Sequence, residues 1–227
     1  MIRIYIPKIL DFYDKDVDSR RHSNSIKAIS GEEMGLALLK HYWESSGAKL
    51  GTIEYPCTTG RRKGPRLDGW LKVQEKKQVV LYQIEVKSWS IHGICDRGKY
   101  NILLNNANTE QLKDFRIKRW EDYWDSSQNR FKASQLDKVL VKMKYKGEKN
   151  FKSQKALACL WVSIHPEGKS EVMFTVPCKS EHFDEVTIFS MSNYLRECYA
   201  NGTKELEIET PDLSARMSHL NEMFTQL

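Results

Sequence analysis

Hydrophobic and polar residues alternate along two neighbouring segments, residues 66–73 and 82–89. Alternation of this kind is typical of β-strands that bury one face, so both segments are predicted strands. The charged sequence 75–78 between them predicts an antiparallel hairpin. The side chains expected on one face are Leu67, Leu71, Val73, Tyr82, Ile84 and Val86, and those on the other are Arg66, Asp68, Trp70, Lys72, Gln83, Glu85, Lys87 and Trp89.

The length of the turn determines which residues of this hairpin lie opposite each other. A loop centred between Lys76 and Lys77 places Asp68 directly opposite Glu85, on the same face. Two opposed carboxylates repel each other and destabilise a sheet. A divalent cation between them would remove this penalty, and Mg²⁺ prefers such oxygen ligands. The turn lacks the Asn-Gly or Asp-Gly sequence that is typical of tight hairpins.

The rest of the chain alternates between predicted helices and strands. Ser30 and Glu33 have the spacing of a capping box, which predicts a helix from there to a stop at Gly47. Residues 156–164 form a continuous apolar run, typical of a strand covered on both faces. Further strands are expected at 2–6, 48–55, 170–176 (paired with the apolar run), 184–189 and 205–209, further helices at 109–125, 134–145, 191–199 and from 211, and a loop or loose helix at 11–29.

Composition narrows the classes of protein to consider. The 227 residues suit one domain with additions, and the net charge of +6 is consistent with a polyanionic partner. The five cysteines are odd in number and form no Cys-x-x-Cys pair, which argues against a disulfide framework and a structural zinc site. A reducing cytoplasm is therefore the expected compartment. We expect no signal peptide and no membrane span, because the apolar runs are short and interrupted by charges.

The two strands carry a recognisable motif. Asp68, followed by Glu85-x-Lys87 on the next strand and preceded by a helix with an acidic residue, resembles the PD-(D/E)XK nuclease superfamily. The resemblance covers roughly residues 30–165, because element boundaries read from one sequence are accurate only to a few residues. One departure is that the residue before Asp68 is Leu67 and not proline.

The resemblance implies a restriction-endonuclease-like α/β fold. Its αβββαβ core has a mixed central sheet flanked by helices, in agreement with the packing that the predicted elements favour. We expect this core within residues 1–165, including an N-terminal extension at 1–29. Residues 166–227 would then be C-terminal α+β additions packed on the same domain.

The resemblance also assigns roles to the residues of the motif. Asp68, Glu85 and the carbonyl of Val86 would bind Mg²⁺, for which Mn²⁺ could substitute, and Lys87 would position the attacking water and stabilise the charge on phosphorus. The residue chemistry agrees, since a carboxylate on an apolar central strand is costly unless it is paired. The structural alternatives are a solvated Asp68 and a salt bridge from Glu85 to Lys87 or Arg66.

Other candidates depend more on context. Glu33 would support the metal or its water shell, but the capping box explains it equally well, and Glu32 is the adjacent competitor. Gln83 and Gln111 are further candidates for the site. Trp70 and Trp89 could stack on a displaced base, although packing on the sheet is favoured, and His92 is the only histidine near the motif. Backbone phosphates are expected to contact the basic loop of Arg61, Arg62, Lys63 and Arg66, and Arg97 and Lys99 could do the same.

These residues together predict a metal-dependent nuclease that hydrolyses phosphodiester bonds, a DNA endonuclease acting in restriction, defence, repair or mobile-element processing. One alternative is a non-catalytic nucleic-acid-binding or assembly module on the same scaffold. Another is a nuclease that cleaves RNA. The expected partner is DNA, with a homodimer or a larger nuclease complex left open, and no membrane partner is expected.

Overall fold

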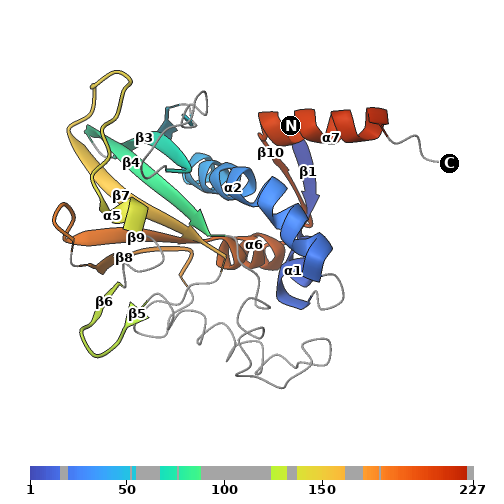
Figure 1. The fold of residues 1–227 in the computed structure, drawn as a ribbon, viewed down its shortest axis with the longest axis horizontal. Helices are drawn as coiled ribbons and strands as arrows, with labels where there is room; N and C mark the ends of the chain where they lie inside the picture. The colour runs from blue at the N-terminus through green and yellow to red at the C-terminus, as the bar shows by residue number, and fades with distance from the viewer. Residues whose placement is uncertain are drawn as a thin grey trace.

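A mixed six-stranded sheet forms the centre of the computed structural model, which describes residues 1–15, 20–51, 53–54, 67–75, 77–87, 124–131, 137–161, 171–178 and 180–223 (Figure 1). The sheet confirms the predicted α/β class with a mixed sheet and flanking helices. Its strands, in spatial order, are β2 (Lys49–Leu50), β3 (Gly69–Glu75), β4 (Gln78–Lys87), β7 (Ser153–Leu160), β9 (Glu185–Ser190) and β8 (Met173–Pro177).

The β3–β4 hairpin has the predicted register. Its pairs run from Gly69 opposite Ile84 to Glu75 opposite Gln78, with a two-residue loop between the strands. This confirms the register that alternation and loop length predict. The ladder ends at Gly69, so Asp68 lies just beyond it.

Strand β4 is a central strand, as its apolar sequence predicts. It pairs antiparallel with β3 and parallel with β7, and β7 in turn pairs parallel with β9. The predicted pairing of residues 170–176 with the apolar run at 156–164 is wrong, because β8 pairs with β9 at the edge of the sheet. The apolar strand β7 takes a central position instead, where both of its faces are covered.

Two small sheets lie outside the central one. The first joins β1 (Ile2–Tyr5) to β10 (Glu205–Ile208), so that strands from both ends of the chain pair with each other. The second joins β5 (Trp124–Asp125) to β6 (Arg130–Phe131). Residues 124 and 125 are therefore strand and not the end of the predicted helix at 109–125, whose other residues lie outside the described part of the chain.

The long helix α2 (Arg20–Ser45) begins well before Ser30, so the predicted capping box is wrong. The helix ends where expected, and Gly47 follows it with a φ of 77°, a conformation that glycine adopts readily. The other helices in the described part of the chain are α1 (Ile6–Lys15), α5 (Asp137–Leu140), α6 (Met191–Ala200) and α7 (Pro211–Met223). No helix in the described ranges is long and apolar enough to cross a membrane.

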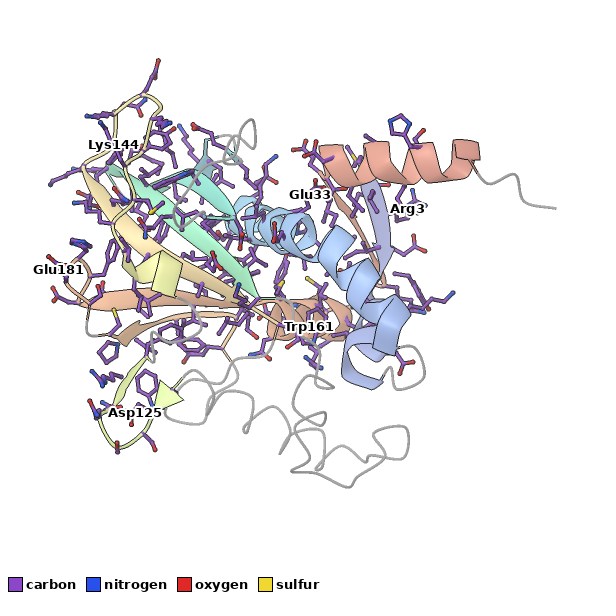
Figure 2. The ribbon with its side chains drawn as sticks, viewed as in Figure 1. Arg3, Glu33, Asp125, Lys144, Trp161 and Glu181 are labelled. Carbon is purple, nitrogen blue, oxygen red and sulfur yellow. The ribbon has the colours of Figure 1, made fainter. Side chains whose placement is uncertain are left out.

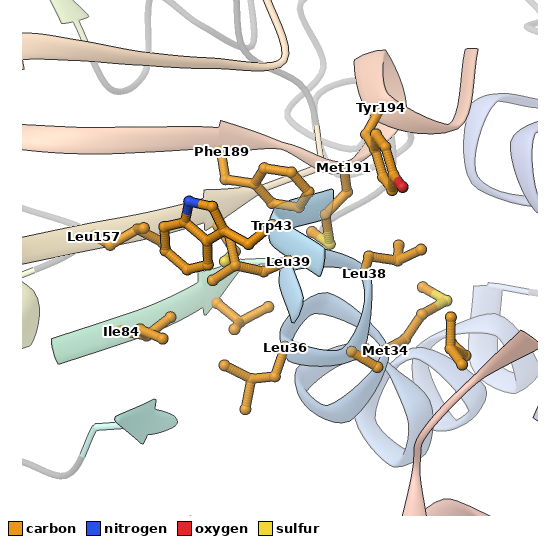
Figure 3. Close-up of a cluster of buried hydrophobic side chains, with 14 of the residues drawn as sticks. Met34, Leu36, Leu38, Leu39, Trp43, Ile84, Leu157, Phe189, Met191 and Tyr194 are labelled. Atoms are coloured by element: carbon orange, nitrogen blue, oxygen red, sulfur yellow. The ribbon is translucent and has the colours of Figure 1, made fainter. Parts of the chain in front are cut away.

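The main core lies between α2 and the face of the sheet that carries Tyr82, Ile84 and Val86 (Figure 3). Helix α2 supplies Leu36, Leu38, Leu39 and Trp43, and α6 adds Met191, Tyr194 and Leu195. The opposite face is covered by α5, the β5–β6 hairpin and the residues that follow α5. Burial of these large apolar side chains is the main force that fixes α2 against the sheet.

Two glycines allow α2 to approach the hairpin closely. A Cβ at Gly35 would lie 2.6 Å from Val86 Cγ1 and 3.2 Å from Met191 Sδ, and a Cβ at Gly69 would lie 3.0 Å from Leu36 Cδ1. The first distance is shorter than real contacts allow. These positions therefore set the distance between α2 and the C-terminal end of β4.

The close approach predicts that Gly35→Ala lowers the free energy of unfolding, although alanine is the better helix former. Helix propensity alone would stabilise the protein by up to about 1 kcal/mol, whereas the collision with Val86 costs about 1–3 kcal/mol. We expect a net loss in the free energy of unfolding, measured by urea denaturation. The control Glu44→Ala, on an exposed position of the same helix, should stay within about 0.5 kcal/mol. A Gly35→Ala protein as stable as the parent would contradict this packing.

Candidate active site

Asp68 closes the open end of the β3–β4 ladder. Its backbone N–H donates to the Ile84 carbonyl (3.1 Å), and its carboxylate Oδ2 accepts a hydrogen bond from the Val86 N–H (2.7 Å). The side chain thus takes the place of a backbone acceptor beyond the last pair of the ladder. These two hydrogen bonds hold Asp68 beside β4. The predicted direct pairing of Asp68 with Glu85 is not part of the ladder, which ends at Gly69.

The alternation of the first strand breaks at this point. Leu67 packs with Trp70 and Leu81, on the face opposite to Leu71 and Val73. The prediction that Leu67 faces the same way as Leu71 is therefore wrong. One extra residue in a strand turns the side chains that precede it to the other face of the sheet. Here this irregularity lies between Leu67 and Trp70.

Glu85 is buried on the central strand, with 1% of its surface exposed. Its Oε1 accepts a hydrogen bond from Lys87 Nζ at 2.8 Å, and the Lys87 side chain is 20% exposed. A buried carboxylate is tolerated when such a partner offsets its lost hydration. Of the two structural alternatives for Glu85, the ion pair with Lys87 is thus present.

Two neighbouring carboxylates influence Asp68 at this end of β4. Burial and the negative charges of Glu85 and Glu32 together raise the pKa of Asp68 to about 7, while the Val86 N–H and Lys87 act in the opposite direction. The charge of Glu85 ranks directly after burial among these causes. The site thus has an excess of negative charge that a proton or a metal cation would neutralise.

The donor set is compatible with a hard divalent cation. The Val86 N–H points towards Asp68, and in a strand the carbonyl of the same residue faces the same edge. Two carboxylates and one carbonyl suit Mg²⁺, which is usually held by one or two carboxylates and keeps several waters. In the part of the chain that the structure describes, there is no group of three or more His, Cys, Asp or Glu side chains that could hold a metal. Water would have to complete the coordination.

Glu33 and Glu32 differ from the sequence-based expectation. Glu33 is buried, and its Oε2 accepts a hydrogen bond from the Leu213 N–H at 2.7 Å, at the N-terminus of α7 (Figure 2). Glu32 is exposed, and its charge acts on Asp68. Because α2 starts earlier than predicted, the capping box does not set the roles of these two residues. Of these two acids, Glu32 is the one whose charge raises the pKa of Asp68. The expectation that Glu33 supports a metal or its water shell stays a prediction.

Gln83, which the sequence places on the face of Glu85, has a structural role. It is fully buried, its Nε2 donates to the Val141 carbonyl at 3.0 Å, and its Oε1 accepts from the Met143 N–H at 3.2 Å. Trp70 packs against Tyr145, with ring centroids 5.3 Å apart, as the packing alternative predicts. The candidates that lie outside the described residues are Arg61, Arg62, Lys63, Arg66, Trp89, His92, Arg97, Lys99 and Gln111.

The raised pKa of Asp68 predicts how stability depends on pH. Between the usual pKa of 3.8 and about 7, the folded protein holds a proton that the unfolded chain has lost, so this group makes the protein less stable as pH rises through that window. Asp68→Asn removes the contribution. We therefore expect the stability of the variant relative to the parent, in metal-free urea denaturation, to increase from pH 5 to pH 8. A constant difference would contradict the assignment.

Substitutions of the two acids of α2 should have different effects on the free energy of unfolding. Glu33→Ala removes the acceptor for the α7 N-terminus and should lower the free energy of unfolding by about 1–3 kcal/mol. Glu32→Ala, at an exposed position, should stay within about 0.5 kcal/mol but lower the pKa of Asp68, measured by NMR titration. Equal losses of stability, or an unchanged Asp68 titration in Glu32→Ala, would show that the roles are assigned wrongly.

Comparison with known proteins yields no relative. The chain matches no protein-family model, no curated protein and no solved structure among those compared. The function of the site must therefore be argued from the geometry of Asp68, Glu85 and Lys87 and from the fold that brings them together.

Proposed function

We propose that this protein is a Mg²⁺-dependent nuclease that hydrolyses phosphodiester bonds in DNA. The observation that carries the proposal is the convergence of Asp68, Glu85 and Lys87 at one end of the β3–β4 hairpin. There a buried carboxylate pairs with the lysine, and its charge raises the pKa of the neighbouring aspartic acid. A partly buried acid with a raised pKa, next to a second carboxylate and a lysine, is the kind of cluster that active sites contain.

The order of the elements supports a restriction-endonuclease-like core. Helix α2 precedes the antiparallel meander β2–β3–β4, and β7 then lies parallel beside β4. This is the order expected for an αβββαβ core. Its second helix is the one predicted at 109–125, which stays a prediction. The segment 166–227 contributes β8 and β9 to the same sheet, and the proposed domain boundary at residue 165 stays a prediction as well.

In the proposed reaction, Asp68, Glu85 and the Val86 carbonyl would hold the ion, and Glu32 would add negative charge beside them. The ion, when bound, would polarise the scissile phosphate and lower the pKa of a bound water. Lys87, which now donates to Glu85, would turn its ammonium group towards the water and the phosphate oxygens. There it would orient the nucleophile and stabilise the negative charge that develops on phosphorus.

A second candidate function rests on the ion pair itself. Lys87 and Glu85 neutralise each other without any metal, as expected of a non-catalytic nucleic-acid-binding or assembly module that keeps the scaffold. Cleavage of RNA is a further alternative within the nuclease class.

The cytoplasmic location, a homodimer and a larger nuclease complex remain predictions. The free thiols of Cys159, Cys178 and Cys198 agree with a reducing compartment.

The proposal predicts that purified protein cleaves DNA with Mg²⁺ or Mn²⁺ and not with chelator. Glu85→Gln and Lys87→Met should each lower the cleavage rate by about 100-fold or more, because each removes a group that acts on the reacting phosphate or its water. Supercoiled, linear and single-stranded DNA and RNA are compared on gels.

The matched controls are Glu207→Gln and Lys204→Met, exposed positions on or beside β10, which should keep the parent rate. Metal-dependent cleavage that survives in both Glu85→Gln and Lys87→Met would reject the proposed site. Absence of cleavage by the parent with every substrate and metal would favour the non-catalytic module.

A further inference from the structure

The segment that follows α5 presents lysines in a regular arrangement. Lys142, Lys144 and Lys146 are exposed, whereas Met143 is half-buried and Tyr145 is buried. The sequence predicted a helix at 134–145, but among the described residues of this segment only Asp137–Leu140 is helical. Residues 142–146 instead alternate between outside and inside, as an extended chain does, so neighbouring lysines project about 7 Å apart on the solvent side. We call Lys142, Lys144 and Lys146 the lysine track.

The side-chain amides of Gln83, which is buried, and Gln154, which is half-buried, hold the start of the track in place. The Gln83 side chain bonds the main chain of Val141 and Met143, and Gln154 Nε2 donates to Gln83 Oε1 at 2.6 Å and to the Met143 carbonyl at 3.0 Å. These bonds satisfy main-chain groups that a helix would have satisfied internally. The track is therefore attached to β4 and β7 and does not depend on its own secondary structure.

Tyr145 anchors the second half of the track. Its ring lies 5.3 Å from that of Trp70 and 5.8 Å from that of Phe151, and its hydroxyl donates to Glu54. At Gly147 an added Cβ would collide with the Tyr145 hydroxyl, so the chain turns tightly around this side chain. A buried aromatic side chain with a hydrogen-bonded hydroxyl is a rigid anchor, and it keeps the lysines on either side facing outwards.

The track begins beside the candidate active site. Gln83, which holds Val141 and Met143, is two residues before Glu85 on the same face of β4, about 7 Å along the strand. From there the chain leads away to the far end of the sheet from α7, where Lys144 lies (Figure 2). The track thus lines a path from the carboxylates along the sheet.

The charges of this segment suit a polyanion. Residues 141–152 contain five lysines and one glutamate. Among the residues that the structure describes, no carboxylate forms an ion pair with Lys142, Lys144 or Lys146. Lysine is a point charge that contacts phosphate without reading bases. The aromatic rings of the segment face inwards, away from any base, whereas single-strand binders use exposed rings for stacking.

We propose that the lysine track binds the sugar–phosphate backbone of duplex DNA without sequence preference and directs the duplex towards Asp68 and Glu85. The part of this inference in which the track directs DNA to the carboxylates rests on the proposed nuclease function. Binding of DNA by the track can be measured without catalysis. Contacts of this type make the affinity strongly dependent on salt, because each neutralised phosphate releases counterions.

The test measures binding of a fluorescein-labelled 24-base-pair duplex by fluorescence anisotropy in EDTA, over a range of salt concentrations. Lys144→Gln/Lys146→Gln is compared with Lys8→Gln/Lys204→Gln, which removes the same charge at exposed positions elsewhere. The track variant should bind roughly 10- to 100-fold more weakly at 0.1 M salt and lose about 2 from the slope of log K against log salt. The control variant should match the parent, and circular dichroism should show both variants folded.

Three results would overturn the track: no binding of duplex by the parent at low salt, equal losses in the two double variants, or tighter binding of single-stranded DNA of the same sequence. The outcome is separate from that of the nuclease proposal. If the track variant loses binding while the parent cleaves nothing with any metal, the nuclease proposal fails and the track stands. If Glu85→Gln abolishes cleavage but the track variant binds normally, the track fails and the nuclease proposal stands.

Discussion

The burial of Glu85 in a central strand is the constraint on which the rest of the site depends. Strand β4 is central in the sheet and the Glu85 side chain is 1% exposed, so its charge must be offset by Lys87, a proton or a cation. Asp68 shares this problem, since burial and the charge of Glu85 raise its pKa to about 7. Replacing a buried ion pair with apolar residues is often neutral or stabilising, so stability alone does not account for this cluster.

Helix α2 connects this cluster to the rest of the molecule. Gly35 and Gly69 allow the helix to lie close to the hairpin, which brings the charge of Glu32 to bear on Asp68. The next residue, Glu33, binds the N-terminus of α7. Two adjacent acids on one helix therefore act on different parts of the fold, one on the candidate active site and one on the docking of the C-terminal helix.

The sequence predicted the hairpin well because alternation and loop length are local properties. The register from Gly69 to Glu75, the central position of β4 and the proximity of Asp68, Glu85 and Lys87 all follow from them. The roles of Glu32 and Glu33 could not be read in this way, because the helix begins ten residues earlier than its capping box suggests. The segment around Met143 has helical spacing, but the buried amide of Gln83 competes for its main chain. The sequence does contain one signal for an extended chain here, because Lys142, Lys144 and Lys146 alternate with apolar residues.

The central claim is that Asp68 and Glu85 jointly bind a divalent cation. The most direct measurement is an anomalous difference map from a crystal soaked in Mn²⁺ at pH 8, where Asp68 is ionised. The account predicts a peak about 2 Å from carboxylate oxygens of both residues, near the Val86 carbonyl, with Lys87 turned from its present contact with Glu85. A map without a peak there, with Lys87 still paired to Glu85, would contradict it.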